Sequence, residues 1–315
     1  MTEASRLGED ILFTVFTPTY NRAHTLNRVY RSLANQTYKN LEWLIVDDGS
    51  TDDTRSLVQR WIKEAKFSIR YHWQENGGKH VAFNRAVGLA HGTLFLPADS
   101  DDDFFPNALE RFAYHWRSIP DNKRHLFTGV TVRCADETGA LIGNDFPTSP
   151  LDSNSLEARY VYKMRSELWG FHRRDVLAQF PFPEPPGHKY VPEGVVWGRI
   201  ARSYKTRYVN EALRTYRQDA GNQLGKQYKT AREYAFVRIF YLESLNSELY
   251  FFRYAAPGFF KMAIEYARLS ILAGDSLLQQ YRQLSGASQK LIWLVVLPVA
   301  SILALRSLLK EYILQ

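Results

Sequence analysis

The sequence predicts an α/β fold, with a mostly parallel sheet flanked by helices and an α-helical C-terminal extension. Two observations lead to this prediction. Apolar, β-branched runs alternate with amphipathic helical patterns over residues 10–110, as the strand–helix units of a parallel sheet require. Polar turns rich in Gly and Asp follow these runs, so several loops converge on the edge where open α/β sheets bind ligands.

The N-terminal elements are predicted from apolar runs and helical periodicity. Strands are expected over residues 11–17, 41–46, 68–73 and 94–96, and helices between them. The helix expected after a Gly pair covers residues 80–90. Pro106 would open a further helix over 107–117, at a position where a missing N–H costs nothing.

The second half of the chain has a less regular pattern. We expect a strand over 125–133, a hairpin turn over 136–139, irregular structure over 144–163 and a short helix ending at residue 180. Five prolines between residues 180 and 192 predict an extended loop over a binding site. Short strands over 206–210 and 212–217 come next, and helices over 229–249, 257–283 and 291–305 complete the chain.

The composition is that of a globular protein with a basic surface. The 315 residues are 45% hydrophobic and 23% charged, with a net charge of +7 and a pI of about 9.3. A basic surface suits nucleic acid, anionic lipid or phosphorylated ligands, and charge alone does not choose among them. The single cysteine, Cys134, excludes an internal disulfide and suits a reducing compartment. Residues 1–10 show no signal-peptide pattern.

Four carboxylates, Asp99, Asp101, Asp102 and Asp103, follow the strand expected over 94–96. Crowded carboxylates repel one another unless a cation lies among them. Mg²⁺ and Mn²⁺ prefer oxygen ligands, and typically use one or two carboxylates together with substrate phosphates. The turn therefore indicates a divalent-metal site. The simpler alternative is a solvated acidic turn that caps the next helix.

Four motifs occur in a characteristic order. They are Thr17-Pro18-Thr19-Tyr20-Asn21-Arg22, Val46-Asp47-Asp48-Gly49-Ser50-Thr51-Asp52, Asn76-Gly77-Gly78, and Asp99-Ser100-Asp101-Asp102 with Pro106 four residues on. Together they resemble the family 2 glycosyltransferases with the GT-A fold. The resemblance implies a GT-A domain over 1–220, with a nucleotide-sugar half at 10–110 and an acceptor half at 111–220, and a helical region over 221–315. It also implies inverting transfer of a sugar from a nucleotide diphosphate sugar.

The resemblance further assigns residues to the donor site. Residues 17–20 and Asp47 or Asp48 would line the base pocket. Asp99 would reach the ribose, Asp101 would bind Mg²⁺ or Mn²⁺, and Asp99 is the second metal-ligand candidate. The full set for the nucleotide sugar is Thr17, Pro18, Thr19, Tyr20, Arg22, Asp47, Asp48, Gly78, Lys79, Asn84, Asp99, Ser100, Asp101 and Arg217.

Several of these residues have simpler explanations. Asp47 and Asp48 could belong to an Asx-type turn that leads into a capped helix. Arg22 and Lys79 could be solvent-facing cations. Arg217, which the resemblance places near the diphosphate, could form a surface salt bridge.

Glu193 is expected to begin a helix, where the helix dipole favours an ionised carboxylate. Family members place an Asp or Glu here to take the proton of the acceptor hydroxyl, so the resemblance makes Glu193 the catalytic base. Gly194 departs from the family, because many members have a second carboxylate at that position. Glu184 and Glu167 therefore stay as weaker candidates, and Glu193 could also be a residue that only stabilises its helix.

The run over 291–305 is the most apolar in the chain, yet shorter than the ~18 uninterrupted apolar residues of a spanning helix. Three roles stay open for it: a packed helix, a helix on the membrane surface, or a dimer helix. Nearby basic residues favour a peripheral membrane contact through 287–311, at the cytoplasmic face of the inner membrane. A lipid-linked acceptor would suit that location.

The sequence thus predicts a metal-dependent glycosyltransferase that moves a sugar to a carbohydrate or lipid-linked acceptor in surface polysaccharide or glycolipid synthesis. A UDP-sugar is the favoured donor. A sugar-phosphate nucleotidyltransferase is the nearest enzyme alternative, although the turn at 17–20 lacks the Gly-rich loop it would need. A basic nucleic-acid-binding protein is the alternative from another class. No recognised motif supports it, so nucleic acid is not an expected partner. A homo-oligomer stays open.

Overall fold

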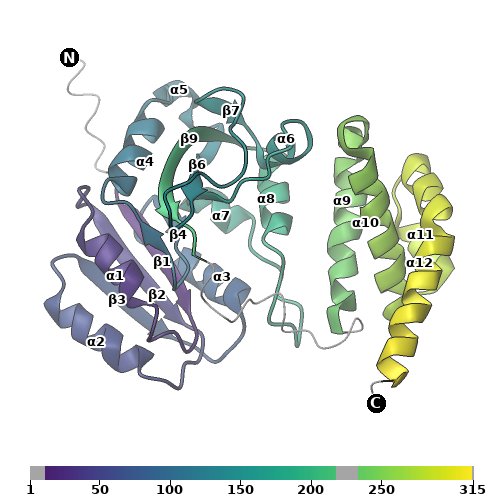
Figure 1. Cartoon of the computed structure of the whole chain (residues 1–315), viewed down its shortest axis with the longest axis horizontal. Coiled ribbons are helices and arrows are strands. Elements are labelled where there is room, and N and C mark those ends of the chain that lie inside the picture. The colour runs from purple at the N-terminus through teal and green to yellow at the C-terminus, as the bar shows by residue number, and fades with distance from the viewer. Residues whose placement is uncertain (1–10, 218–232, 314–315) are drawn as a thin grey trace. The chain divides into compact units, whose positions relative to one another are not determined.

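The computed structural model describes residues 11–217 and 233–313, with side chains to residue 310. Tertiary contacts divide the chain into two compact units, Met1–Gly221 and Asn222–Gln315 (Figure 1). Residues 1–10 and the beginning of the helix expected over 229–249 lie outside the described residues.

Strands and helices alternate in strict succession through the first part of the chain. They are β1 (Phe13–Thr19), α1 (Asn27–Ala34), β2 (Leu41–Asp47), α2 (Thr54–Glu64), β3 (Ser68–Trp73), α3 (Lys79–Leu89) and β4 (Leu94–Pro97). Every strand and helix predicted here is present, with ends that differ by a residue or two. The apolar runs are long and β-branched enough to define these buried strands without ambiguity.

The second part of the unit is more varied. Its elements are β5 (Asp103–Phe104), α4 (Ala108–Arg117), α5 (Asp121–Arg124), β6 (Phe127–Ala135), β7 (Leu151–Ser153), α6 (Ser155–Tyr160), β8 (Leu168–Arg173), α7 (Arg174–Gln179), α8 (Gly194–Ala201) and β9 (Lys205–Thr215). As predicted, the Pro-rich segment between α7 and α8 contains no helix or strand.

Two expectations for this part were wrong, and one strand was missed. The segment 144–163 is not irregular throughout, because it holds β7 and α6, and the Asn154 side chain caps α6 by accepting from two backbone N–H groups. The two short strands expected over 206–217 are one strand, β9, with register shifts against β6. The sequence also gave no sign of β8, where Gly170 interrupts the apolar pattern. A Cβ on Gly170 would meet the Val130 carbonyl oxygen at 2.4 Å, so the close strand pairing needs glycine.

Nine strands of the described chain form one sheet in the order β3-β2-β1-β4-β8-β6-β9-β5, with β7 paired to β9. Strands β1 to β4 pair in parallel, as predicted. Strand β8 lies antiparallel between β4 and β6, so β6 runs in the same direction as β4. The carboxyl ends of β1, β2, β4 and β6 therefore lie along one edge of the sheet. The sheet is mixed, with a parallel N-terminal half.

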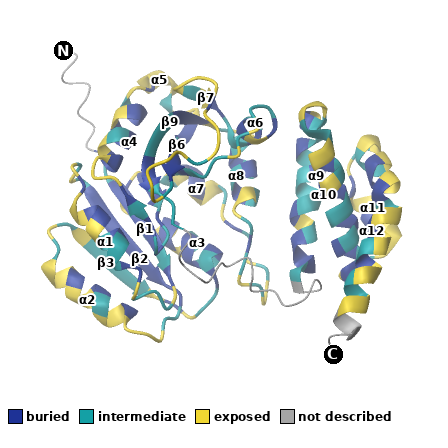
Figure 2. Ribbon diagram, in the orientation of Figure 1, coloured by how far each residue is buried: buried dark blue, intermediate teal, exposed yellow. Residues whose placement is uncertain are grey.

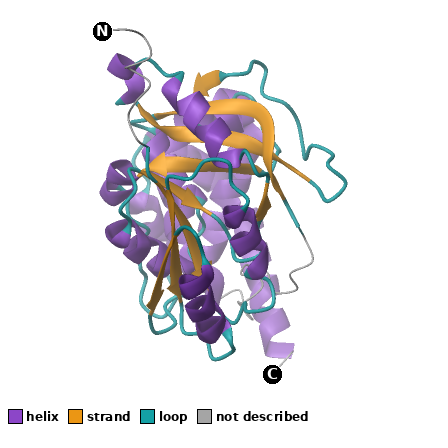
Figure 3. Ribbon diagram, turned by 90° about the vertical axis from the view of Figure 1, so that its left-hand side faces the viewer, coloured by secondary structure: helices purple, strands orange, loops and turns teal. Residues whose placement is uncertain are grey.

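Helices cover both faces of the sheet, which lies between them in two perpendicular views (Figures 1 and 3). Helices α1, α2 and α4 pack on one face around a core that includes Phe13, Trp43 and Phe112. Helix α3 lies on the other face, where Phe83 contacts Phe16 and Phe95 at ring-centroid distances of 5.6 and 5.2 Å. Burial on both faces explains why β1 and β2 are almost entirely buried, whereas β3, at the edge of the sheet, is partly exposed (Figure 2).

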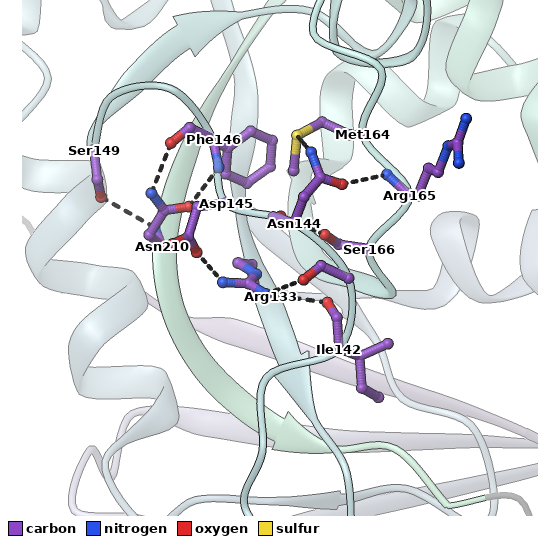
Figure 4. Close-up of polar contacts among 11 residues, drawn as sticks. Arg133, Ile142, Asn144, Asp145, Phe146, Ser149, Met164, Arg165, Ser166 and Asn210 are labelled. Atoms are coloured by element: carbon purple, nitrogen blue, oxygen red, sulfur yellow. Dashed lines mark hydrogen bonds and ion pairs between the residues drawn. The ribbon is translucent and has the colours of Figure 1, made fainter.

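Arg133 fixes the segment that follows β6 (Figure 4). Its side chain is 2% exposed, it pairs with Asp145, and Nη2 donates to the carbonyl of Ile142 at 3.2 Å. Asn210 of β9 completes the attachment, because its side chain accepts from the N–H of Phe146 and donates to the Phe146 carbonyl. A buried, paired cation thus fixes this segment beside the carboxyl end of β6.

The C-terminal unit is helical, as predicted. Its described elements are η3 (Glu233–Val237), α9 (Arg238–Glu248), η4 (Leu249–Phe251), α10 (Phe252–Leu272), α11 (Leu277–Gln283) and α12 (Ala287–Ile313). The single helix expected over 257–283 is two helices, separated at Gly274 with φ +87° and restarted by a capping box at Ser276. Helix α12 is longer than the predicted 291–305. Its segment Ala287–Lys310 is long and apolar enough to cross a membrane.

Candidate active site

Polar loops follow β1, β2, β3 and β4 at one edge of the sheet, and hydrogen bonds join the first three of them. Asn21, with φ +53°, accepts from the N–H of Thr51 at 2.8 Å, which ties the loop after β1 to the loop after β2. Asp48 ties the loop after β2 to the loop after β3, because its carboxylate accepts from Gly77 and Gly78 N–H at 2.9 and 2.8 Å. The loops form one connected rim.

Lys79 joins two carboxylates at this rim. Its Nζ lies 2.7 Å from Asp99 Oδ1, which follows β4, and 2.8 Å from Glu193 Oε1, which begins α8. Burial would lower the pKa of Lys79, but the two carboxylates outweigh it and raise that pKa above its ordinary value. Burial likewise opposes ionisation of Asp99, yet the Lys79 ammonium holds the pKa of Asp99 below its ordinary value. The three groups form a charged cluster.

A second charged side chain, the buried Arg214, supports this cluster through Asp102. The Arg214 guanidinium, on β9, lies 3.3 Å from Asp102 Oδ2 and 2.8 Å from Glu167 Oε1. Asp102 in turn accepts the N–H of Asp99 at 2.8 Å, which fixes the turn that carries Asp99. Burial raises the pKa of Asp102 to about 7, although Arg214 opposes the rise. Sequence reasoning missed Arg214, because β9 also contains Lys205 and Arg207 and nothing in the sequence distinguishes the one that lies at the site.

A pocket of about 250 Å³ lies beside the charged cluster. Lys79, Asp99, Glu193 and Arg214 contribute to its lining. The rest of the lining includes Phe83, Pro97, Thr128, Thr131, Ser155, Trp169, Trp197, Thr206 and Tyr208. The pocket combines apolar walls with a few convergent polar groups, as small-molecule sites do.

His172 of β8 also lines this pocket, and sequence reasoning missed it too. Its ring stacks on Trp197 of α8, with centroids 4.6 Å apart and an interplanar angle of 11°. Its Nδ1 shares a hydrogen bond of 2.9 Å with Thr128 Oγ1. Burial lowers the pKa of His172 to about 4, so the ring is neutral at pH 7. The stacked pair forms a flat aromatic wall.

The residues predicted to line a base pocket lie in different surroundings. Thr17 faces the core, where it is fully buried and its hydroxyl accepts from Trp43 Nε1 at 2.9 Å. Thr19 is 2% exposed, and its hydroxyl has no hydrogen-bond partner in the described part of the chain. Pro18 is partly buried and Tyr20 is 49% exposed. Thr19 and Tyr20 thus offer more to a ligand than Thr17 does.

Asp47 and Asp48 are both engaged within the protein. Asp47 is fully buried and accepts from Ser50 N–H at 2.7 Å and from the Tyr71 hydroxyl at 2.5 Å. Asp48 also accepts from Gln74 Nε2 at 2.7 Å, in addition to its two glycine contacts. Asp48 is 5% exposed, so it is the better placed of the two to receive a further hydrogen bond.

The loop between α7 and α8 packs on the start of α3. Gly78 has φ +99°, and a Cβ there would meet the Lys189 carbonyl oxygen at 2.2 Å. Asn84 binds the same loop, because its side chain donates to the Phe182 carbonyl at 2.9 Å and to Glu184 at 2.7 Å. The glycine and Asn84 therefore hold the Pro-rich loop in this structure.

The remaining predicted residues lie around the turn after β4. Asp101 is partly exposed, and within the described residues its carboxylate makes no hydrogen bond or ion pair. Ser100 is buried. Arg22 is close enough to contribute to the low pKa of Asp99. Arg217 pairs with Asp103 at 3.1 Å and with Glu137 at 3.6 Å.

Comparison with known proteins identifies the class. Residues 14–167 match the family model described as Glycosyl transferase family 2. The chain is 26% identical over 276 residues to the GalNAc(5)-diNAcBac-PP-undecaprenol beta-1,3-glucosyltransferase of Campylobacter jejuni, an alignment that covers 82% of this chain and 83% of the relative. Residues 14–167 belong to glycosyl transferase family 2, and the chain is a glycosyltransferase. Family membership selects glycosyl transfer over the nucleotidyltransferase and nucleic-acid alternatives.

Solved structures agree on the fold. The crystal structure of S. aureus TarS in complex with UDP-GlcNAc superposes with a TM-score of 0.63 at 20% identity, and covers 92% of this chain and 80% of that one. The mannosyltransferase PcManGT from Pyrobaculum calidifontis, solved with GDP-Man and Mn²⁺, gives a TM-score of 0.54 at 19% identity over 95% and 88% of the two chains. The fold is GT-A.

Proposed function

We propose that this glycosyltransferase moves a sugar from a nucleotide diphosphate sugar to a hydroxyl of a lipid-linked carbohydrate, with inversion at the anomeric carbon. A UDP-sugar is the favoured donor. One observation carries the proposal. The carboxylate after β4 and the carboxylate that begins α8 both lie within 2.8 Å of Lys79 Nζ, so they flank one small space beside a pocket. A direct displacement needs a leaving-group site on one side of such a space and a base on the other.

Glu193 is the proposed base. Its side chain is 50% exposed, which leaves it accessible to an acceptor hydroxyl. It stands at the start of α8, and its Oε1 lies 2.8 Å from Lys79 Nζ. Glu193 takes the hydroxyl proton while the acceptor oxygen bonds to the anomeric carbon and the bond to the diphosphate oxygen breaks. No covalent intermediate with the protein is required.

Asp99 and Asp101 would hold Mg²⁺ or Mn²⁺. Both come from the turn after β4 and offer hard oxygen donors, and Asp101 has no competing partner among the described residues. No three His, Cys, Asp or Glu side chains gather as a metal cage in the described part of the chain, which fits a site completed by substrate phosphates. A bound divalent cation would neutralise charge on the leaving diphosphate.

Lys79 is the cation of the ligand-free site. Its ammonium contacts both the carboxylate proposed for the donor side and the proposed base, so its single positive charge is shared between them. We expect the negative charge of a donor diphosphate to draw this ammonium away from Asp99. Lys79 would then stabilise the diphosphate, and Asp99 would be free to bind the donor.

The pocket beside the cluster would hold a sugar ring. Its aromatic wall, Trp197 stacked on His172, suits the apolar face of a pyranose, and the threonines around it offer hydroxyls. The Campylobacter jejuni relative carries an undecaprenol-linked acceptor in its name. A lipid-linked acceptor for this chain, and a place at the cytoplasmic face of the inner membrane with contact through residues 287–311, are parts of the proposal.

The experiment that tests the proposal is thermal stabilisation by UDP, GDP, dTDP and CMP, each with Mn²⁺ and with chelator. Ligand that binds the native state raises the melting temperature. We expect a metal-dependent rise with UDP that is lost in Asp101→Ala and kept in Asp121→Ala, a matched change on exposed α5. No rise with any nucleotide, or an equal rise in chelator, would contradict the proposed donor site.

A further inference from the structure

Helix α12 carries an apolar surface that nothing in the described unit covers. Six side chains, Leu291, Leu294, Val295, Val299, Ile302 and Leu305, are between 49% and 63% exposed. Apart from the adjacent Leu294 and Val295, they are spaced by three or four residues, which places them on one side of the helix. A continuous apolar face of this length is unusual on a soluble surface and indicates a binding partner.

The opposite side of α12 is packed against its own unit. Trp293 is 3% exposed and Ala300 is fully buried. Near one end of the helix, Trp293 Nε1 donates to Gln280 at 3.1 Å. Near the other end, Ser307 accepts from Arg268 of α10 at 3.3 Å. The helix is thus attached to its unit along most of its length.

This attachment decides between two membrane geometries. The length and hydropathy of α12 would allow it to span a bilayer. A spanning α12 would carry α10 with it, and α10 bears exposed Lys261 and the ion pair between Arg268 and Glu265. Charged groups at bilayer depth are costly, and the alternative, stripping α10 from α12, would expose both buried faces. An in-plane helix keeps every one of these contacts.

The charges beside the apolar face indicate which kind of partner it binds. Residues 277–311 contain four cations, Arg282, Lys290, Arg306 and Lys310, against one carboxylate, Glu311. Basic side chains beside an apolar helix face are attracted to anionic lipid headgroups, whereas a second copy of this chain would bring like charges together. The same face continues into an apolar groove lined by Tyr250, Phe260 and Ile292, which extends the surface available to acyl chains.

We propose that α12 lies in the plane of an anionic bilayer and inserts its exposed apolar face between the lipids. The inference deepens the proposed function, because it rests on the membrane contact proposed there and specifies its geometry and lipid class. It places both ends of α12 on the same side of the membrane. The C-terminal unit then attaches the catalytic domain to one side of the membrane without crossing it.

Flotation of the full-length protein with vesicles tests the partner. We expect binding to phosphatidylcholine vesicles that contain phosphatidylglycerol, and much weaker binding to phosphatidylcholine alone. Leu294→Glu with Ile302→Glu should lower the vesicle-bound fraction by about tenfold or more. The matched control is Leu126→Glu with Leu141→Glu, which changes two apolar side chains of similar exposure in the catalytic unit and should float as wild type does.

A second pair of variants tests the charges. Arg306→Gln with Lys310→Gln should reduce binding to the anionic vesicles by about tenfold at low salt. Arg60→Gln with Lys63→Gln, on exposed α2, should not. UDP binding should be unchanged in all four variants, which separates failure of this inference from failure of the proposed donor site. Flotation that is indifferent to the apolar substitutions, or a dimer that only those substitutions dissociate, would overturn the inference.

Cysteine accessibility tests the geometry. In a Cys134→Ser background, Ser288→Cys and Lys310→Cys mark the two ends of α12. In sealed inside-out inner-membrane vesicles, an impermeant maleimide should label both positions without detergent. Protection of one end until detergent is added would show a spanning helix and overturn the in-plane geometry.

Discussion

At the scale of single residues, Lys79 determines the charge balance of the ligand-free site. The resemblance placed Lys79, Asp99 and Glu193 in one active site, and the structure brings their charged atoms into contact. What sequence could not give is their mutual contact, because it depends on how the loop after α7 packs on α3. Arg214 and His172 were missed for a similar reason, since each lies on a strand whose partners are distant in sequence.

Lys79→Met should tighten Mn²⁺ binding by nucleotide-free protein by about fivefold to tenfold, because the ammonium 2.7 Å from Asp99 competes with any cation there. The same variant should bind UDP more weakly. Titration calorimetry measures both affinities. Lys189→Met, which removes an exposed lysine nearby, is the control and should change neither. Weaker or unchanged Mn²⁺ binding in Lys79→Met would exclude this competition.

At the scale of elements, the strands and helices with clear periodicity were predictable and the short ones were not. Strands β1 to β4 were predictable because their apolar runs match a buried strand better than any other element. Strand β8, β7 and α6 are short, and tertiary pairing rather than local propensity determines them. The cap at Asn154 was readable in principle, because Asn before a helical start with Glu at its third position is a capping pattern.

The contact between Gly78 and the Pro-rich loop gives a prediction for that loop. Gly78→Ala combines an unfavourable backbone at φ +99° with a clash against the Lys189 carbonyl, whereas Gly187→Ala at φ +77° adds strain with no atom within 4 Å. We expect trypsin to cleave after Lys189 several-fold faster in Gly78→Ala than in Gly187→Ala. Equal cleavage rates would show that the loop does not depend on this contact.

The burial of His172 gives a prediction for stability against pH. Its folded-state pKa of about 4 lies below the ordinary value of 6.5, so the unfolded chain binds more protons between these values. The free energy of unfolding therefore falls as the pH is lowered through this range, by about 2 kcal/mol at pH 5 from this group. His172→Gln should lose that part of the dependence, measured by guanidinium unfolding at pH 7.5 and pH 5. The control, His125→Gln at an exposed position, should retain it.

At the scale of the whole molecule, the fold class and the helical C-terminal region were predictable, because alternating strand–helix units admit few topologies. The mixed character of the sheet was not, since the reversal at β8 has no local signature. The sequence also left the role of α12 undecided among a packed helix, a membrane-surface helix and a dimer helix. Only its packing on α10 shows which of its sides stays exposed.

The central claim is that Glu193 acts as the base of a transfer from a nucleotide diphosphate sugar. The most direct test is the initial rate of nucleotide diphosphate release from UDP-sugars with Mn²⁺, compared among wild type, Glu193→Gln and Glu184→Gln. Glu184 lies on the same loop and binds Asn84, so it is the matched control.

We predict that Glu193→Gln lowers the rate by about a hundredfold or more while UDP affinity stays within about twofold of wild type. Glu184→Gln should keep the rate within about fivefold of wild type. A Glu193→Gln enzyme that retains most of its rate, or a loss that instead follows Glu184, would contradict the assignment.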